Sequence, residues 1–275
     1  MNLAPGIVFP LGAALALYLL GWRRGSMPPR RFRQGAFLAG WAILAAALVS
    51  PLHELGESLF SAHMLQHELL MIAAAPLLVW SRPLAQLLRG FPRAWRAPLV
   101  RVLTHPIVRR LIDTLAAPAF AFVTQGIAIW LWHAPALFQA TLHSQVAHAL
   151  QHASFFGTAL LFWWSLMRGA RGRRNFGLGL LSVFLTTLHT GALGALLSLS
   201  STVYYPAYGQ AAQQFGLSPL EDQQLGGLIM WIPGGVAYVV GALALAAGWL
   251  RNSEARAARR DALRAAPWAG ALPLR

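Results

Sequence analysis

The sequence predicts an all-α membrane protein, a polytopic helical bundle of seven transmembrane helices with its N terminus outside and its C terminus in the cytoplasm. The first observation behind this prediction is composition. Of the 275 residues, 57% are hydrophobic and only 11% are charged, whereas a soluble domain carries about 25% charged residues. The second is the distribution of charge: all 22 basic residues are Arg, and they cluster between the apolar runs. Most of the nine His residues lie toward the opposite ends of those runs.

Seven apolar stretches have close to the ~20 residues that a helix needs to cross a bilayer. The expected spans are 4–22, 34–51, 59–80, 115–133, 145–167, 177–199 and 225–250. The Arg clusters follow the first, third, fifth and seventh spans, and the positive-inside rule therefore places these loops in the cytoplasm. The first run lacks a basic start and is followed by Arg, which is typical of a retained anchor rather than a cleaved signal peptide.

Nearly all of the chain is used by these spans, so we expect one transmembrane domain, 1–251, followed by an Arg-rich cytoplasmic tail, 252–275. The segment 82–114 interleaves Leu, Phe and Trp with Arg at helical spacing. This pattern predicts short amphipathic helices in contact with lipid of the inner leaflet. Small residues such as Gly194 and Gly227 predict close helix packing and permit a homo-oligomer. Gly227 and Gly234 are also open to an interpretation as residues that shape a site.

Several classes of function are poorly supported. The chain has no Cys, which excludes disulfides and thiolate metal ligands within it. The net charge of +14 is explained by positive-inside loops, so we expect no nucleic-acid partner. A phosphate-binding glycine loop, a GxSxG motif and a triad-like signature are all missing from the sequence, so we do not expect an enzyme.

Histidines form the main polar pattern within the apolar runs. His63 and His67 are four residues apart at the start of the third span, and His148 and His152 repeat that spacing in the fifth, so each pair shares one helix face. At 1.5 Å per residue, His67 and His152 lie about 12 Å below the outer ends of their spans. His189, on the sixth span, lies about 15 Å down by the same rise. These three residues are therefore expected at nearly equal depth.

A polar side chain in hydrocarbon costs several kcal/mol unless it has a partner. Several imidazoles at one depth can hydrogen-bond to each other, bind a metal, ligate haem or line a proton path. Imidazole suits copper, zinc, iron and nickel, and thioethers from Met64, Met71 or Met230 would bias such a site toward Cu(I). Core packing is the favoured interpretation of Met64, because it points away from the face that His63 and His67 share.

Acidic residues near these histidines leave two interpretations each. Glu68 follows His67 and either orients an imidazole or faces another helix. Glu221 and Asp222 precede the last span and form either a helix cap or an acidic mouth that attracts cations from outside. His133 closes the fourth span at its outer end.

Four sequence motifs together carry a family resemblance. They are HMLQH at 63–67, APLL at 75–78, WHAP at 132–135 and EDQQLGGLIMW at 221–231. With these, the chain from about residue 30 to 250 resembles the CtaG family of cytochrome c oxidase assembly proteins, the polytopic family associated with caa-type oxidases. The resemblance implies a seven-span bacterial inner-membrane protein that helps to build a haem-copper oxidase and supplies copper to it. The functional positions that it implies, as metal ligands, are His63, His67, His133, His148, His152, His189 and Asp222.

Three hypotheses follow for the function. In the first, copper enters from outside past Glu221 and Asp222, is held by the histidines and passes to a cytochrome c oxidase subunit. In the second, facing histidines hold haem and the protein is a membrane redox protein. In the third, the chain is a metal-free scaffold that docks oxidase subunits.

Overall fold

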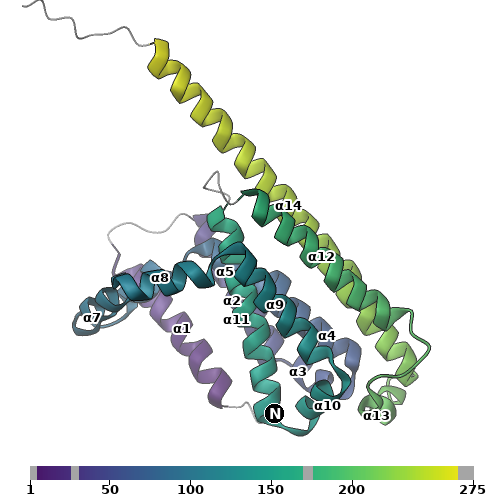
Figure 1. The fold of residues 1–275 in the computed structure, drawn as a ribbon. Coiled ribbons are helices and arrows are strands. Elements are labelled where there is room, and N and C mark those ends of the chain that lie inside the picture. Colours follow the sequence, from purple (N-terminus) through teal and green to yellow (C-terminus); the bar gives the residue numbers. More distant parts are fainter. Residues whose placement is uncertain (1–4, 26–30, 170–175, 266–275) are drawn as a thin grey trace, which may run out of the picture.

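The computed structural model describes residues 5–25, 31–169 and 176–265, and all regular structure within these ranges is helical (Figure 1). The prediction of an all-α protein is therefore confirmed. The longer helices are α1 (Pro5–Arg23), α2 (Arg31–Val49), α9 (Pro118–His133), α11 (Gln145–Gly169), α12 (Phe176–Ser198) and α14 (Pro219–Ala265). The third expected span consists of α4 (Phe60–Glu68), the π-helix η1 (Leu69–Ala74) and α5 (Ala75–Ser81). The shorter elements are α3 (Pro51–Ser58), α6 (Leu84–Gly90), α7 (Arg93–Thr104), α8 (Pro106–Leu115), α10 (Pro135–His143), the 3₁₀-helix η2 (Pro206–Tyr208) and α13 (Gly209–Gln213).

Five helical stretches in the described residues are long and apolar enough to cross a membrane. They are Gly6–Arg23, Arg31–Val49, Phe60–Ser81, Phe176–Ser198 and Pro219–Ala262. A sixth is obtained if α8 and α9, which meet at an angle of 62°, count as one span. By length and composition, the described residues therefore contain five or six candidate membrane spans, whereas the sequence predicts seven. The physical reasons are that α9 alone has only 16 residues and that α11 opens with a polar turn that includes His148.

The third span changes its helical winding just after His67. The π-helix Leu69–Ala74 begins there, and Pro76 follows it. Because proline lacks an N–H and its ring clashes with the carbonyl four residues earlier, Pro76 disfavours regular α-helical hydrogen bonding at this point. The Trp163 indole N–H donates to the freed Met71 carbonyl at 2.9 Å. Single π turns of this kind are frequent at functional sites.

Close packing between α12 and α14 confirms the expectation drawn from the small residues. The two helices run side by side in Figure 1 and are in contact. A Cβ added at Gly194 would lie 2.9 Å from the Gly227 carbonyl oxygen, and one added at Gly227 would lie 2.5 Å from Ser198 Oγ. Real Cβ atoms do not approach so closely, so these glycines serve packing within the chain.

Segment 82–114 forms three short helices, α6, α7 and most of α8, as the sequence predicts. Figure 1 shows α7 and α8 lying well away from α10 and α13. Large apolar side chains on this segment are exposed, with Trp95 63% and Ile107 71% accessible. An ion pair of 2.7 Å between Asp113 and Arg168 joins the segment to α11. Contact with the inner leaflet remains a prediction.

The last helix continues without a break through the expected boundary at residue 252. It runs to Ala265, and its final turns project beyond the other helices in Figure 1. The rest of the expected tail, 266–275, lies outside the described residues, as do Arg30, Arg171, Arg173 and Arg174 of the loops expected in the cytoplasm.

Candidate metal centre

Three helices bring a group of imidazoles together. Helix α4 carries His63 and His67, α11 carries His148 and His152, and α3 carries His53. The two rings of each expected pair lie side by side, with centroids 4.4 Å apart for His63 and His67 and 4.3 Å apart for His148 and His152. The spacing of four residues therefore places both members of each pair on one helix face, as predicted.

The innermost part of this group is the buried trio, defined as His63, His67 and His152. Their ligand nitrogens all lie within 4.8 Å of one another, and all three side chains are buried. The ring centroids of His67 and His152 are 5.1 Å apart, and those of His63 and His152 are 5.7 Å apart. Neutral imidazole nitrogens at this spacing provide the donor set that borderline transition metals prefer.

His67 is the least satisfied residue of the trio. Neither of its ring nitrogens has a hydrogen-bond partner among the described residues, and Nε2 of His152 is likewise unpaired. A neutral imidazole carries one N–H donor and one acceptor, and leaving either unpaired in a buried site costs about 1–3 kcal/mol. A bound cation would take up the imidazole lone pair, to which no group among the described residues donates a hydrogen bond. The trio therefore fits a metal ion.

His63 is held from both sides. Its Nδ1 lies 3.2 Å from the Gly56 carbonyl oxygen, and its Nε2 lies 3.2 Å from Gln151 Oε1. The Tyr208 hydroxyl donates to the same Gly56 carbonyl at 3.1 Å. Burial, with the nearby Asp222 charge, raises the pKa of the Tyr208 phenol well above its usual value, so this hydroxyl stays protonated as a donor. These contacts fix the position of the His63 ring.

His133 and Met64 lie beside the trio. The His133 Nδ1–H donates to the Ile129 carbonyl at 2.7 Å, which leaves Nε2 with a free lone pair 3.4 Å from Met64 Sδ. The His133 and His67 rings are 6.3 Å apart. Met64 is buried in the core, as favoured from the sequence, but it contacts an imidazole as well. Together they add a nitrogen and a soft thioether at the edge of the trio.

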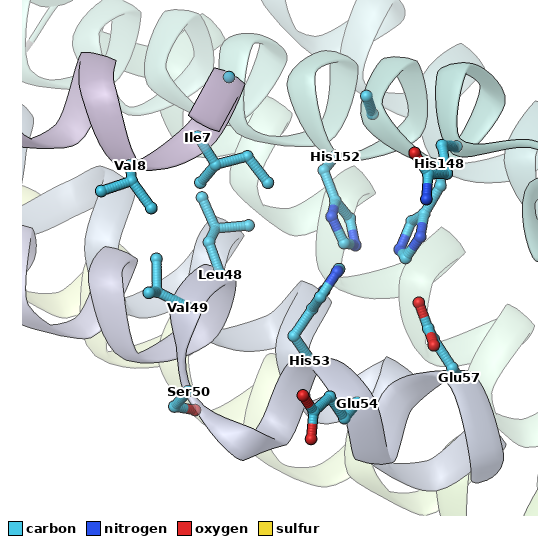
Figure 2. A pocket seen from close by; sticks show the side chains of 13 residues that line it. Ile7, Val8, Leu48, Val49, Ser50, His53, Glu54, Glu57, His148 and His152 are labelled. Atoms are coloured by element: carbon cyan, nitrogen blue, oxygen red, sulfur yellow. The ribbon is translucent and has the colours of Figure 1, made fainter. Parts of the chain in front are cut away.

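A cavity of about 470 Å³ lies beside α3 and reaches His152 of the trio. It is lined by residues of α1, α2, α3 and α11, including His53, Glu57, His148 and His152. Figure 2 shows the rings of His53, His148 and His152 pointing toward one another across this space, with the Glu57 carboxylate beside His148. His152 therefore belongs to the trio and also borders the cavity.

Comparison with known proteins assigns the family. The profile of the cytochrome c oxidase caa3 assembly factor family matches residues 16–252. The chain belongs to this family. Uncharacterized proteins of Mycobacterium bovis and Mycobacterium tuberculosis are each 29% identical over 94% of the chain, and one of Mycobacterium leprae is 23% identical over 91%. The match covers only 40% of the length of each of these relatives. No solved structure matches the chain.

Among the histidines that the family resemblance implied, His189 is the exception to the cluster. The structure places it between Trp130 and Phe122, where its Nδ1 accepts the Trp130 indole N–H at 3.3 Å and its ring lies 5.8 Å from that of Phe122. It makes no ring contact with another His in the described part of the chain. The depth calculated from the rise per residue therefore does not bring this side chain to the trio.

Asp222 also departs from the expectation of an acidic mouth. Its carboxylate is fully buried and accepts the backbone N–H groups of Phe60 and Ser61 at 2.7 Å and 3.0 Å. The alternative expectation, a helix cap, fits this geometry. Asp222 caps α4, however, and not α14, the helix on which it lies. Leu59 at the start of α4 provides no side-chain cap of its own, so Asp222 satisfies these donors from another helix.

Glu68 faces another helix rather than an imidazole. A Cβ added at Gly234 of α14 would lie 3.2 Å from Glu68 Oε2, which has no hydrogen-bond partner among the residues described. Successive residues on a helix are rotated by about 100°, so the neighbour of His67 points to a different side. Gly234 thus makes room for a carboxyl group, which supports its interpretation as a residue that shapes the interior.

Sequence reasoning missed His53. This residue lies in the outer segment between the second and third spans, where only Glu54 and Glu57 drew attention. In the structure its ring stacks on that of His148 with centroids 5.2 Å apart. The available signal was the spacing of four between His53 and Glu57, which places both on one face of a short helix.

Proposed function

We propose that this protein binds copper at the buried trio and supplies it to a caa3-type cytochrome c oxidase during assembly. The family gives the process, because its members are described as assembly factors for that oxidase. The observation that supports a metal is His67, a buried imidazole with both nitrogens unpaired among the described residues. The role is that of a carrier rather than of an enzyme.

Copper is the ion that the donor set favours. Affinity at nitrogen sites rises along the first-row divalent metals to a maximum at Cu²⁺, and a thioether favours Cu(I). The trio offers imidazole nitrogens, and Met64 Sδ lies beside the neighbouring His133. The oxidase that the family serves is a haem-copper enzyme, so copper is also the cargo that the process requires.

We place the cluster on the outer side of a bacterial plasma membrane. In this arrangement α9 and α11 join the five long apolar stretches to give seven spans, with the N terminus outside and the C terminus in the cytoplasm. The Arg clusters then all face the cytoplasm, as the positive-inside rule requires. Copper would reach the cavity beside α3 from outside and leave toward an oxidase subunit at the same face.

The two other hypotheses are less well supported by the geometry. Haem between His pairs requires a flat macrocycle to lie between two facing rings, whereas neighbouring rings in this cluster pack directly against one another, with centroids 4.3–5.1 Å apart. A metal-free scaffold would leave His67 buried without partners for either nitrogen, at the cost given above. Both hypotheses predict that copper binding is not needed for oxidase assembly.

The proposal is tested by complementation of a strain that lacks this protein. The double variant His67→Ala, His152→Ala should leave the oxidase short of copper and of activity, although its polypeptides are made. His105→Ala, which removes an exposed His in the short-helix segment between the third and fourth spans, should restore copper content and activity fully. Equal restoration by both variants would contradict a copper role for the trio.

A further inference from the structure

We propose a second, outer cation site made of His53, Glu57 and His148, which loads the buried trio. This inference rests on the proposed copper function and adds the route by which the ion enters. The ligand atoms of these three residues all lie within 4.8 Å of one another. Two imidazoles and a carboxylate form a donor set that first-row divalent ions accept readily.

Local structure builds this outer site on two helices. Ser50 accepts the Leu52 N–H and starts α3, and Pro51 occupies its first position, which is favourable for proline. His53 and Glu57 are then one turn apart on the same face. His148 comes from the first turn of α11, and its ring stacks on that of His53. The Gln66 amide contacts His53 Nδ1 at 3.1 Å and so orients the ring.

Exposure distinguishes the outer site from the inner one. Glu57 is exposed and His53 and His148 are half-buried, whereas the members of the trio are buried. All three outer residues line the cavity shown in Figure 2. Yet Nε2 of His148 is itself buried and has no hydrogen-bond partner among the described residues, so one ligand of the outer site is aimed inward and unsatisfied.

The two sites share a border. The His148 ring lies 4.3 Å from that of His152 and 5.2 Å from that of His63, so an outer ligand contacts two inner ones. An ion held by His53, Glu57 and His148 can therefore exchange one ligand at a time for His152 and His63. No bond to carbon changes and no electron is transferred; each incoming imidazole nitrogen replaces one outer ligand atom, either an imidazole nitrogen or the Glu57 carboxylate oxygen.

Charge gives this route a direction. The Glu57 carboxylate, with Glu54 also at the cavity, attracts a cation at the entrance, and steering of this kind raises association rates by 10-fold or more. The trio itself has no carboxylate among its three ligands, and it holds the ion away from water. The outer site should therefore govern the rate of loading and the trio the final affinity.

The test uses the full chain purified in detergent, with copper alone as the probe. Wild-type protein should bind two copper ions, and the variant His53→Ala, Glu57→Gln should bind one and load the trio about tenfold more slowly. The variant His67→Ala should retain the outer ion alone. The variant His143→Ala removes an exposed His at the end of α10, on the same side of the molecule, and should match wild type.

The outcomes separate the two proposals. If His53→Ala, Glu57→Gln binds as many ions as wild type at the same rate, the outer site is wrong and the copper function stands. If it binds none while its thermal unfolding matches wild type, the two sites are a single site and the relay is wrong. The single variant Glu57→Gln keeps the shape of α3, and it should slow loading without lowering final occupancy of the trio. An unchanged loading rate would overturn the steering role of Glu57.

Discussion

The carboxylate of Asp222 on α14 accepts both the backbone N–H and the hydroxyl of Ser61 on α4, at 3.0 Å and 2.5 Å. Ser61 lies two residues before His63. The contact therefore joins the start of the helix that carries two of the five clustered histidines to a helix more than 150 residues away in the sequence. Asp222 acts on the candidate centre by positioning α4, with no ligand role needed.

Replacement of Asp222 should loosen this junction. Asp222→Ala leaves the first amide donors of α4 unpaired and is expected to lower the free energy of unfolding by about 2 kcal/mol. Copper affinity should fall as well, because His63 and His67 lose their fixed position. Thermal unfolding and copper titration of the purified protein measure the two effects. Glu254→Gln, at an exposed position on the same helix, is the matched control and should change neither.

The contact between α12 and α14 should be sensitive to a single methyl group. Gly227→Ala places a Cβ 2.5–2.7 Å from Ser198 Oγ and the Gly194 carbonyl, and overpacking of this kind costs about 1–3 kcal/mol. Gly235→Ala, on the same helix, meets no atom within 4 Å and should be neutral or slightly stabilising. Unfolding temperatures of the two variants in one detergent provide the comparison. Equal temperatures would show that the helices do not pack as described.

His189 should be dispensable for copper binding. The structure pairs it with the Trp130 indole and not with the cluster, so His189→Ala is expected to bind copper as wild type does. His67→Ala should lose the ion of the trio. Equilibrium dialysis with copper distinguishes the variants directly. Loss of the same ion in both would mean that His189 reaches the trio and that the placement of α12 is wrong.

The proposed topology can be tested with introduced thiols, because the natural sequence has no Cys to react in the background. Ser144→Cys, at an exposed position between α10 and α11, should react with a membrane-impermeant maleimide in intact cells. Thr104→Cys, exposed at the end of α7, should react only after the membrane is opened. The reverse pattern would place the histidine cluster on the cytoplasmic side.

Much of the architecture could be predicted because it depends on one-dimensional patterns. Apolar length and Arg clusters predict helices and their loops, and a spacing of four predicts that His63 and His67, or His148 and His152, share a face. The structure confirms the helices and the shared faces, but the Arg residues described after the third and seventh spans lie mostly in helices rather than in loops. The short helices within 82–114 follow from the same periodicity.

Features that depend on how helices rotate and meet could not be predicted. Depth along the bundle is calculated from residue number, but the direction of the His189 side chain depends on the rotation of α12 about its axis. The capping of α4 by Asp222 is a contact between distant parts of the chain that no local pattern indicates. His53 was missed because the segment 51–58 was expected to be a loop, where a spacing of four has no consequence.

The most direct measurement is X-ray absorption at the copper edge, on protein loaded with a single equivalent of copper and desalted. We expect retained copper with imidazole nitrogens as its nearest neighbours. In the His67→Ala, His152→Ala variant this spectrum should be replaced by that of copper at the outer site, with a carboxylate oxygen of Glu57 among the nearest neighbours. Copper that washes out of the wild-type protein, or a spectrum that is unchanged in the variant, would contradict the assignment of the buried trio as the metal centre.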